Sequence, residues 1–391
     1  MNDAPNEAGS FAFTLRKSCP HTRARLGSLR TPHGSTSTPA FMPVGTAASI
    51  KGVEPRRIRD TGSRIVLCNT YHLVLRPGDD VVRDLGGLHA FMRWDGPILT
   101  DSGGYQVFSL AELTETDRDG VTFRSHIDGR TLRLTPERAM EIQLNLGSDV
   151  MMAFDECLPA HADREETARS LEERTLPWAR RCLDLHPGDG RALFAVAQGG
   201  LHEDLRRACV RALAAEPFDG LALGGLSVGE SKEEMRAMVS ASTAEMPAEK
   251  PRYLMGVGSP LEILDAVALG VDLFDCVLPT RNGRNGAALT FEGVLRLKNA
   301  RHTRDAAVIE RDCPCAACSG GFSRAYLRHL LQSREMLGAT LMSIHNLTFM
   351  QRLMAGIREA LETNTFESFR QRLAAKLAGE TSIPATRNTS T

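Results

Sequence analysis

Residues 192–200 read ALFAVAQGG, an unbroken apolar run that ends in a polar amide and two glycines. A short run that is apolar at every position is typical of a strand buried on both faces of a parallel sheet. Seven other runs share this character, with helical stretches between them: FMPVG (41–45), RIVLC (64–68), PILTD (97–101), DVMMAFDE (149–156), GLALGG (220–225), YLMGV (253–257) and VDLFDC (271–276). Eight strand and helix units favour an α/β fold of the (β/α)₈ TIM barrel type over a doubly wound sheet.

The stretches between these runs carry signals for helix starts and ends. Thr135-Pro136 predicts a helix that begins at the proline, because proline fits the first helical position. Two further starts resemble capping boxes and one glycine marks a helix end: Ser231 with Glu234, Ser259-Pro260 with Glu262, and Gly270.

Two insertions interrupt the alternation of strands and helices. Within residues 102–134, the segment VTFRSHIDGRTLRL contains two alternating runs around Asp128-Gly129, which predicts a β-hairpin. Residues 277–345 follow the last predicted strand and hold a basic stretch and a cluster of cysteines.

The cysteine cluster reads Cys313-Pro-Cys315-Ala-Ala-Cys318. Three thiolates and one imidazole form a complete tetrahedral set for Zn²⁺, with no position left for water, so we expect one structural zinc ion per subunit. Spacing alone leaves two candidates for the fourth ligand, His345 and His329, and favours His345.

Composition excludes several classes of protein. The chain has 391 residues, 42% of them hydrophobic, and no apolar stretch approaches the ~18 residues of a membrane span. Its first residues, MNDAPNEAGS, do not resemble a targeting peptide. The six cysteines outside the cluster lack the spacing of a disulfide framework, so we expect a cytoplasmic protein.

The net charge of −1 means that a nucleic-acid partner would need a local basic surface. Residues 281–328 provide a candidate, because they carry nine Lys or Arg residues against four acidic residues, a balance of +5. The alternative interpretation is an ordinary solvated face.

Polar groups follow several of the predicted strands. In a barrel, the carboxyl ends of the strands form the active site, so we expect Asp101, Asp155, Gln198 and Asp275 to meet there. Glycine pairs at other strand ends would bring backbone N–H groups close to a small planar ligand. Two carboxylates at one ligand indicate a nucleophile and an acid/base, as in glycosidic bond cleavage. For each of these residues the alternative is a helix cap or a core side chain.

The motifs DSGGYQVFSL, MMAFDEC, AQGG, GLALGGLSVGE, YLMGVG and DLFDCVLPTRNGRNG occur in this order, before the cysteine cluster and a late His-Asn pair. Over residues 11–378 the chain resembles the tRNA-guanine transglycosylase family. The resemblance implies an irregular barrel with an inserted C-terminal zinc-binding subdomain. It also implies exchange of guanine at the anticodon wobble position of G-U-N tRNAs (those for Asp, Asn, His and Tyr), a step of queuosine biosynthesis.

The resemblance also implies roles for individual residues. Asp275 would attack the ribose and form a covalent RNA–enzyme intermediate, while Asp101 would act as general acid/base. The substrate base would contact Ser102, Gly103, Gly104, Tyr105, Asp155, Gln198, Gly225, Leu226, Val228 and Met255, with Tyr105 and Met255 as stacking walls. RNA would contact Gly256, Val257, Gly258, Ser259, Pro260, Leu261, Glu262, Thr280, Arg281, Asn282, Gly283 and Arg284. The zinc ligands would be Cys313, Cys315, Cys318 and His345.

Two residues resemble the bacterial form of the family. Val228 occupies a position where eukaryotic members, which accept the bulkier queuine, tend to have glycine, and Cys157 follows Asp155-Glu156. The expected incoming base is therefore 7-aminomethyl-7-deazaguanine. The resemblance further implies a homodimer. The segment Ser319-Gly320-Gly321 departs from the pattern by making the zinc loop slightly longer.

These inferences divide the chain into five expected parts: a disordered N-terminus (1–10), the barrel (11–276), an inserted RNA-contacting and zinc-binding subdomain (277–350), closing helices (351–378) and a disordered tail (379–391). Two other functions use the same features. A hydrolase of nucleosides or glycosides would use the two aspartates with water as acceptor. A non-catalytic RNA-binding partner subunit would keep the zinc motif but lack the catalytic pair, and both Asp101 and Asp275 are present.

Overall fold

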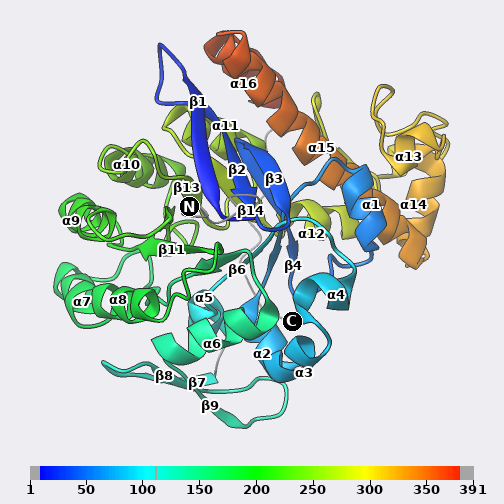
Figure 1. The fold of residues 1–391 in the computed structure, drawn as a ribbon. Coiled ribbons are helices and arrows are strands. Elements are labelled where there is room, and N and C mark those ends of the chain that lie inside the picture. Colours follow the sequence, from blue (N-terminus) through cyan, green and yellow to red (C-terminus); the bar gives the residue numbers. More distant parts are fainter. Residues whose placement is uncertain (1–8, 111, 379–391) are drawn as a thin grey trace, which may run out of the picture.

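The computed structural model describes residues 9–110 and 112–378 (Figure 1). Eight parallel strands close a barrel in the spatial order β10-β11-β12-β13-β14-β4-β5-β6. Each lies in one of the eight apolar runs or begins one residue before it: β4 (Ala40–Gly45), β5 (Val66–Cys68), β6 (Ile98–Thr100), β10 (Val150–Met152), β11 (Ala192–Ala197), β12 (Gly220–Leu223), β13 (Arg252–Leu254) and β14 (Leu273–Cys276). The prediction of a (β/α)₈ barrel is confirmed.

Alternation along each strand divides the apolar side chains between the barrel interior and the surrounding helices. The interior cluster receives at least one buried side chain from every strand, among them Met42, Leu67, Leu99, Met152, Phe194, Ala222, Tyr253 and Leu273. Both faces of each strand are therefore buried, which is why the runs show no polar alternation in the sequence.

An N-terminal antiparallel sheet closes one end of the barrel. It consists of β1 (Ala12–Ser18), β2 (Arg25–Thr31) and β3 (Gly34–Thr38), which the sequence analysis did not predict. Leu29 belongs to the interior cluster, and the ring of Phe11 meets that of Phe194 edge to face at 5.7 Å. The Phe11 N–H also donates to Gly190 O, just before β11, so this sheet covers the amino ends of the strands and leaves the carboxyl ends for a ligand.

The first insertion forms a second antiparallel sheet of β7 (Glu112–Thr116), β8 (Val121–Arg124) and β9 (Thr131–Leu134). The predicted hairpin is confirmed, because β8 pairs with β9 around a turn in which Gly129 N donates to Ser125 O. Strand β7 is an addition that the sequence did not predict.

The barrel helices begin and end close to the predicted signals. The Thr135 hydroxyl accepts a hydrogen bond from Arg138 N, and Ser231 forms a complete capping box with Glu234. The prediction of a second capping box was wrong: Ser259 precedes α11 without a side-chain cap, and the Glu262 carboxylate lies 3.6 Å from Lys232 Nζ. The helices are α1 (Pro55–Asp60), α2 (Thr70–Leu75), α3 (Asp79–Asp84), α4 (Gly87–Met92), α5 (Gly104–Leu110), α6 (Pro136–Leu146), α7 (Arg164–Ser170), α8 (Leu176–Asp184), α9 (Glu203–Ala214), α10 (Lys232–Thr243) and α11 (Pro260–Ala268).

The second insertion and the C-terminal helices pack beside β4 and β14 (Figure 1). They comprise α12 (Leu278–Arg284), the hairpin β15 (Ala287–Thr290) and β16 (Gly293–Arg296), α13 (Ala316–Ser319), α14 (Arg324–Gln332), α15 (Met336–Glu362) and α16 (Phe366–Ala378). Helix α15 contacts α12, α13, α14 and β15, and it runs without a break across residue 350. The domain boundaries given above remain predictions. The disorder proposed for 1–10 and 379–391 falls outside the described residues except at positions 9 and 10.

No helix in residues 9–110 or 112–378 combines the length and the apolar character that crossing a membrane requires.

Candidate active site and metal centre

Asp101 follows β6 at the open end of the barrel and is almost completely buried. Three donors fix its carboxylate. Asn69 Nδ2 and Gln106 Nε2 donate to Oδ2 at 2.5 and 2.8 Å, and Thr70 N donates to Oδ1 at 2.8 Å. Asn69 and Thr70 come directly after β5, the neighbouring strand, so closure of the sheet brings them to Asp101.

Burial raises the pKa of the Asp101 carboxyl to about 6. The three hydrogen bonds lower this pKa, while the nearby charge of Asp275 raises it further. A carboxyl group with a pKa of about 6 can exist in either protonation state near neutral pH, which suits a general acid/base.

Asp275 lies in β14, and two donors converge on its Oδ1 atom. Tyr253 Oη donates at 2.6 Å from the adjacent strand β13, and Gly256 N donates at 2.8 Å from the loop after that strand. Burial raises the pKa of Asp275, and both hydrogen bonds oppose this shift because they favour the charged carboxylate.

Asp155 and Gln198 form a buried pair at the ends of β10 and β11. Gln198 Nε2 donates to Asp155 Oδ2 at 2.7 Å, and Ser102 Oγ donates to Asp155 Oδ1 at 3.3 Å. Burial raises the pKa of Asp155 to about 6, and the charges of Asp101 and Glu156 add to this. The charge of Asp275 raises the pKa of Asp101, and the charge of Asp101 raises the pKa of Asp155. The three carboxyl groups therefore lie close enough to share one site.

Glycine is required beside Gln198. Gly225 has a φ of +62°, and a β-carbon there would lie 2.3 Å from Gln198 Oε1. A β-carbon on Gly224 would lie 2.5 Å from Gln198 Nε2. The two glycines therefore leave room for the amide side chain and expose the backbone of the loop after β12 to a ligand.

The other residues proposed for the base surround these groups to different degrees. Tyr105 is 38% exposed at the start of α5, whereas Met255 is partly buried and packs against the barrel interior. Leu226 is buried, and the backbone N–H groups of Ser227 and Val228 both donate to the Glu230 carboxylate.

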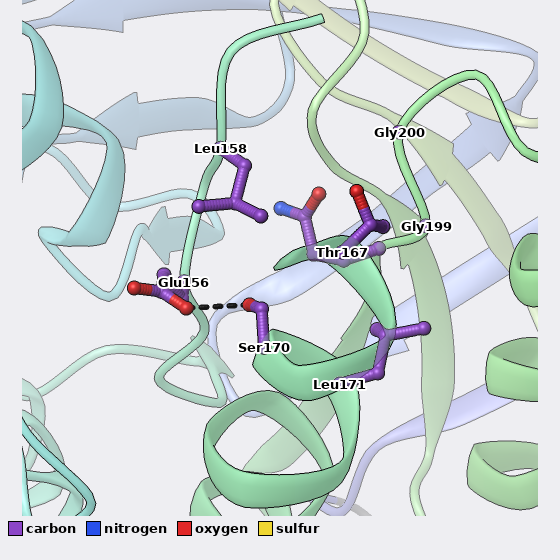
Figure 2. A pocket seen from close by; sticks show the side chains of 8 residues that line it. Glu156, Leu158, Thr167, Ser170, Leu171, Gly199 and Gly200 are labelled. Carbon is purple, nitrogen blue, oxygen red and sulfur yellow. Dashed lines mark hydrogen bonds between the residues drawn. The ribbon is translucent and has the colours of Figure 1, made fainter. Parts of the chain in front are cut away.

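Glu156, next to Asp155 in sequence, faces the surrounding helices instead. Figure 2 shows Glu156 in a small pocket, where the Ser170 hydroxyl donates to its carboxylate. Gln198 also lines this pocket. Arg174 pairs with the same carboxylate oxygen. Of the neighbouring residues Asp155 and Glu156, only Asp155 is therefore placed to contact a ligand in the barrel.

The two stretches proposed for RNA flank Asp275. In the first, Gly256 contacts Asp275, while Val257 is buried and Gly258 packs so closely that a β-carbon would lie 2.3 Å from Cys276 Cβ. In the second, α12 exposes Arg281 and packs Gly283 against the backbone of α15. Burial raises the pKa of Tyr105 and the positive charge of Arg281 opposes this shift, which places this part of α12 near Tyr105.

Sequence reasoning missed the residues that orient the carboxylates of Asp101 and Asp275, namely Asn69, Thr70, Gln106 and Tyr253. Asn69 and Thr70 follow an apolar run, the same signal that singled out Asp101, and could have been found by it. Tyr253 lies inside an apolar run, and only the pairing of β13 with β14 reveals its partner.

The four predicted metal ligands meet in a buried cluster beside α15. The sulfur atoms of Cys313, Cys315 and Cys318 lie 3.6, 3.4 and 3.5 Å from His345 Nδ1. A tetrahedral zinc site, with Zn–S of about 2.3 Å and Zn–N of about 2.0 Å, separates sulfur from nitrogen by about 3.5 Å. The cluster thus has the dimensions of a zinc site.

A hydrogen bond selects the ligand atom of the histidine. His345 Nε2 lies 2.8 Å from Leu289 O and can only donate there, which leaves the Nδ1 lone pair to face the three thiols. His329, the other candidate, is exposed on α14 and lies outside the cluster.

A family model described as queuine tRNA-ribosyltransferase matches residues 19–379 of the chain. The chain is 51% identical over 371 residues to the queuine tRNA-ribosyltransferase of Pelotomaculum thermopropionicum, a match that covers 95% of this chain and 100% of that protein. It is 51% identical over 368 residues to the protein of the same name from Lysinibacillus sphaericus, covering 94% and 96%. A third, from Stenotrophomonas maltophilia, is 52% identical over 351 residues, covering 89% and 93%.

Proposed function

Because the chain belongs to the queuine tRNA-ribosyltransferase family, we propose that it is a tRNA-guanine transglycosylase of the bacterial type. It exchanges the guanine at the wobble position of G-U-N anticodons for 7-aminomethyl-7-deazaguanine. The observation that carries this proposal is the meeting of Asp101, Asp155 and Asp275 at the carboxyl end of the barrel, where hydrogen bonds from Asn69, Gln198 and Tyr253 orient the three carboxylates.

In the first half of the reaction, a carboxylate oxygen of Asp275 attacks C1′ of the wobble ribose. The bond from C1′ to N9 of guanine breaks, and its electron pair goes to the departing base. Asp101 supplies the proton that neutralises this base. The hydrogen bonds from Tyr253 and Gly256 hold the Asp275 carboxylate in its charged, attacking form.

In the second half, the incoming base is bound where guanine was. Its N9 loses a proton to the Asp101 carboxylate and attacks C1′, and the bond between ribose and Asp275 breaks. Asp101 thus returns to its protonated form and Asp275 to its charged form. The covalent intermediate keeps the RNA attached while one base leaves and the other enters.

Both hydrogen-bond acceptors and hydrogen-bond donors of the protein contact the edge of the base. Asp155 accepts hydrogen bonds from the N–H groups of a guanine-type base, and Gln198 and the Gly225 N–H are donors for its carbonyl oxygen. Tyr105 and Met255 cover the ring faces. Val228 limits the size of the substituent at position 7, which favours the aminomethyl base over queuine.

The RNA is held beside this site by the residues 256–262 and 280–284. Arg281 and Arg284 of α12 are suited to phosphate contacts, because each guanidinium carries a permanent positive charge. Cys313, Cys315, Cys318 and His345 hold one Zn²⁺ ion per subunit. When bound, this ion supplies a cross-link between the cysteine loop and α15 and takes no part in the exchange.

Two subunits associate in this proposal. Apolar side chains are exposed at the start of α15, where Met336 is 85% and Leu337 44% exposed, and Tyr326 in the first turn of α14 is 41% exposed. Such side chains are typical of a surface that another protein covers. The RNA substrate and the nine unpaired cysteines favour a cytoplasmic location.

The proposal is tested by incubating the protein with labelled guanine and an unmodified G-U-N tRNA. Label in the RNA is expected with the wild-type protein and not with Asp275→Asn. Release of guanine without incorporation would identify a hydrolase instead. RNA binding without either reaction would identify a non-catalytic partner subunit.

A further inference from the structure

Arg206, on α9, is completely buried behind the base site. Its guanidinium donates to backbone carbonyl groups. Nε and Nη2 donate to Gly200 O at 3.1 and 2.9 Å, while Nη1 and Nη2 reach Gly224 O at 3.2 and 3.3 Å. Nη1 also lies 3.5 Å from Ala197 O. Burial lowers the pKa of Arg206 to about 10, so the side chain remains positively charged at neutral pH.

These carbonyl groups belong to the two loops that carry the base-reading groups. Ala197 and Gly200 flank Gln198 after β11, and Gly224 precedes Gly225 after β12. Helix α9 packs directly on the first loop, because a β-carbon on Gly199 would lie 2.7 Å from the backbone of Arg206. One buried guanidinium therefore connects both loops from the side opposite the ligand.

Because a peptide group is planar, the contact of Arg206 with the Gly224 carbonyl also fixes the direction of the Gly225 N–H. The bond between Gly224 and Gly225 is trans, so the Gly224 carbonyl and the Gly225 N–H point in opposite directions. Because Arg206 holds the carbonyl on one side, the N–H must point to the other side. It lies there beside the Cys157 thiol, two residues from Asp155. The positively charged Arg206 guanidinium also polarises the peptide group through the Gly224 carbonyl, which makes the Gly225 N–H a stronger hydrogen-bond donor.

We propose that Arg206 is a positioning residue that aims the Gly225 N–H at the carbonyl oxygen of the purine base and thereby sets the preference for 6-oxo bases. The proposal rests on the function proposed above and adds a residue that does not touch the substrate. Lysine cannot replace this arginine, because a single ammonium group cannot connect both loops in the plane of the fork.

The test compares guanine with 6-thioguanine, whose sulfur is a poorer acceptor and whose N–H groups are unchanged. Equilibrium binding of both bases is measured with wild-type protein and with Arg206→Lys. We expect the wild type to prefer guanine, and Arg206→Lys to weaken guanine binding at least tenfold while 6-thioguanine binding changes less than threefold. The matched control is Arg207→Lys on the same helix, where the guanidinium pairs with Glu203 and Glu245 at the surface, and it should bind both bases like the wild type.

Two outcomes would overturn the proposal: an equal loss for both bases, which indicates a purely structural role, or no loss for either. Incorporation of labelled guanine into tRNA by the wild type is measured separately, so failure of the proposed function is distinguished from failure of this inference. If Arg206→Lys does not fold, a crystal structure of wild-type protein with guanine decides. The Gly225 nitrogen must then lie within hydrogen-bond distance of the base oxygen with the Gly224 carbonyl on Arg206, and a reversed peptide would contradict the inference.

Discussion

Two hydrogen bonds to a single oxygen fix the direction of the Asp275 carboxylate. Asp275→Asn keeps the shape of the side chain but removes the charge that attacks the ribose. We expect exchange to fall by ~10³-fold or more, with little change in RNA affinity. A denaturation-resistant RNA adduct should form with the wild type and be absent with Asp275→Asn, as seen on a denaturing gel. If the adduct persists in Asp275→Asn and is lost in Asp101→Asn, the two roles are reversed.

The raised pKa of Asp101, about 6, predicts a pH dependence for adduct formation. The departing base needs a proton, and the protonated fraction of Asp101 is complete below this pKa and falls about tenfold per pH unit above it. Single-turnover adduct formation without added base should therefore slow as the pH rises above about 6. Asp101→Asn should remove this dependence. Asp155→Asn is the control, because its carboxyl has a similar pKa but no role in proton transfer, so the slope should remain.

The side chain of Val228 is predicted to limit the 7-substituent of the incoming base. Val228→Gly removes the isopropyl group, and the ratio of kcat/KM for queuine over the aminomethyl base should rise by roughly tenfold or more. The backbone N–H of Val228 stays bonded to Glu230, so the loop should keep its position. Wild-type protein that already prefers queuine would contradict this prediction.

Individual residues of the site differed in how visible they were in the sequence. Asp101, Asp155, Gln198 and Asp275 each end or follow an apolar run, and a barrel collects such positions at one end. Their orienting partners come from neighbouring strands. The contact of Tyr253 with Asp275, for example, depends on the register of β13 against β14, which no local pattern encodes.

Among the structural elements, the cysteine loop depends on α15 for its fourth ligand, His345. Cys315→Ser or His345→Ala should lose the metal and destabilise this part of the protein, because structural Zn²⁺ contributes on the order of 10 kcal/mol to such folds. Metal content and thermal unfolding test this, with His329→Ala as the control that should keep both. A variant without metal that is as stable and active as the wild type would refute the structural role.

The sequence predicted those strands whose two faces are both buried in the structure. All eight barrel strands coincide with short, largely apolar runs, which is the pattern of strands buried on both faces. The N-terminal sheet was missed because its strands are mixed or polar, as in GSTST of β3, and are ordered by packing across the end of the barrel. Strand β7, ELTET, likewise gains its structure from pairing with β8.

At the scale of the whole molecule, a net charge of −1 must be reconciled with binding to RNA. Arg281→Ala and Arg284→Ala should each weaken RNA binding and reduce the slope of log affinity against log salt by about 0.7–0.9, if each contacts one phosphate. Arg180→Ala removes the same charge from α8, where Arg180 pairs with Glu216, and should leave affinity and slope unchanged. An unchanged slope in all three variants would mean that the basic stretch is only a solvated face.

The barrel closes where β4 meets β14, with Ala40 opposite Leu273 and Met42 opposite Asp275. A growing chain therefore exposes the unpaired edge of β4 until residue 276 has emerged from the ribosome. About 230 residues separate the end of β4 from residue 276, so at ~5–20 residues per second this interval lasts roughly 12–46 seconds. The same closing event sets Asp275 in place, since its strand is the last to join. A truncated translation product that ends before β14 would thus lack both the closed barrel and Asp275, and it would leave the edge of β4 open to pairing with other chains.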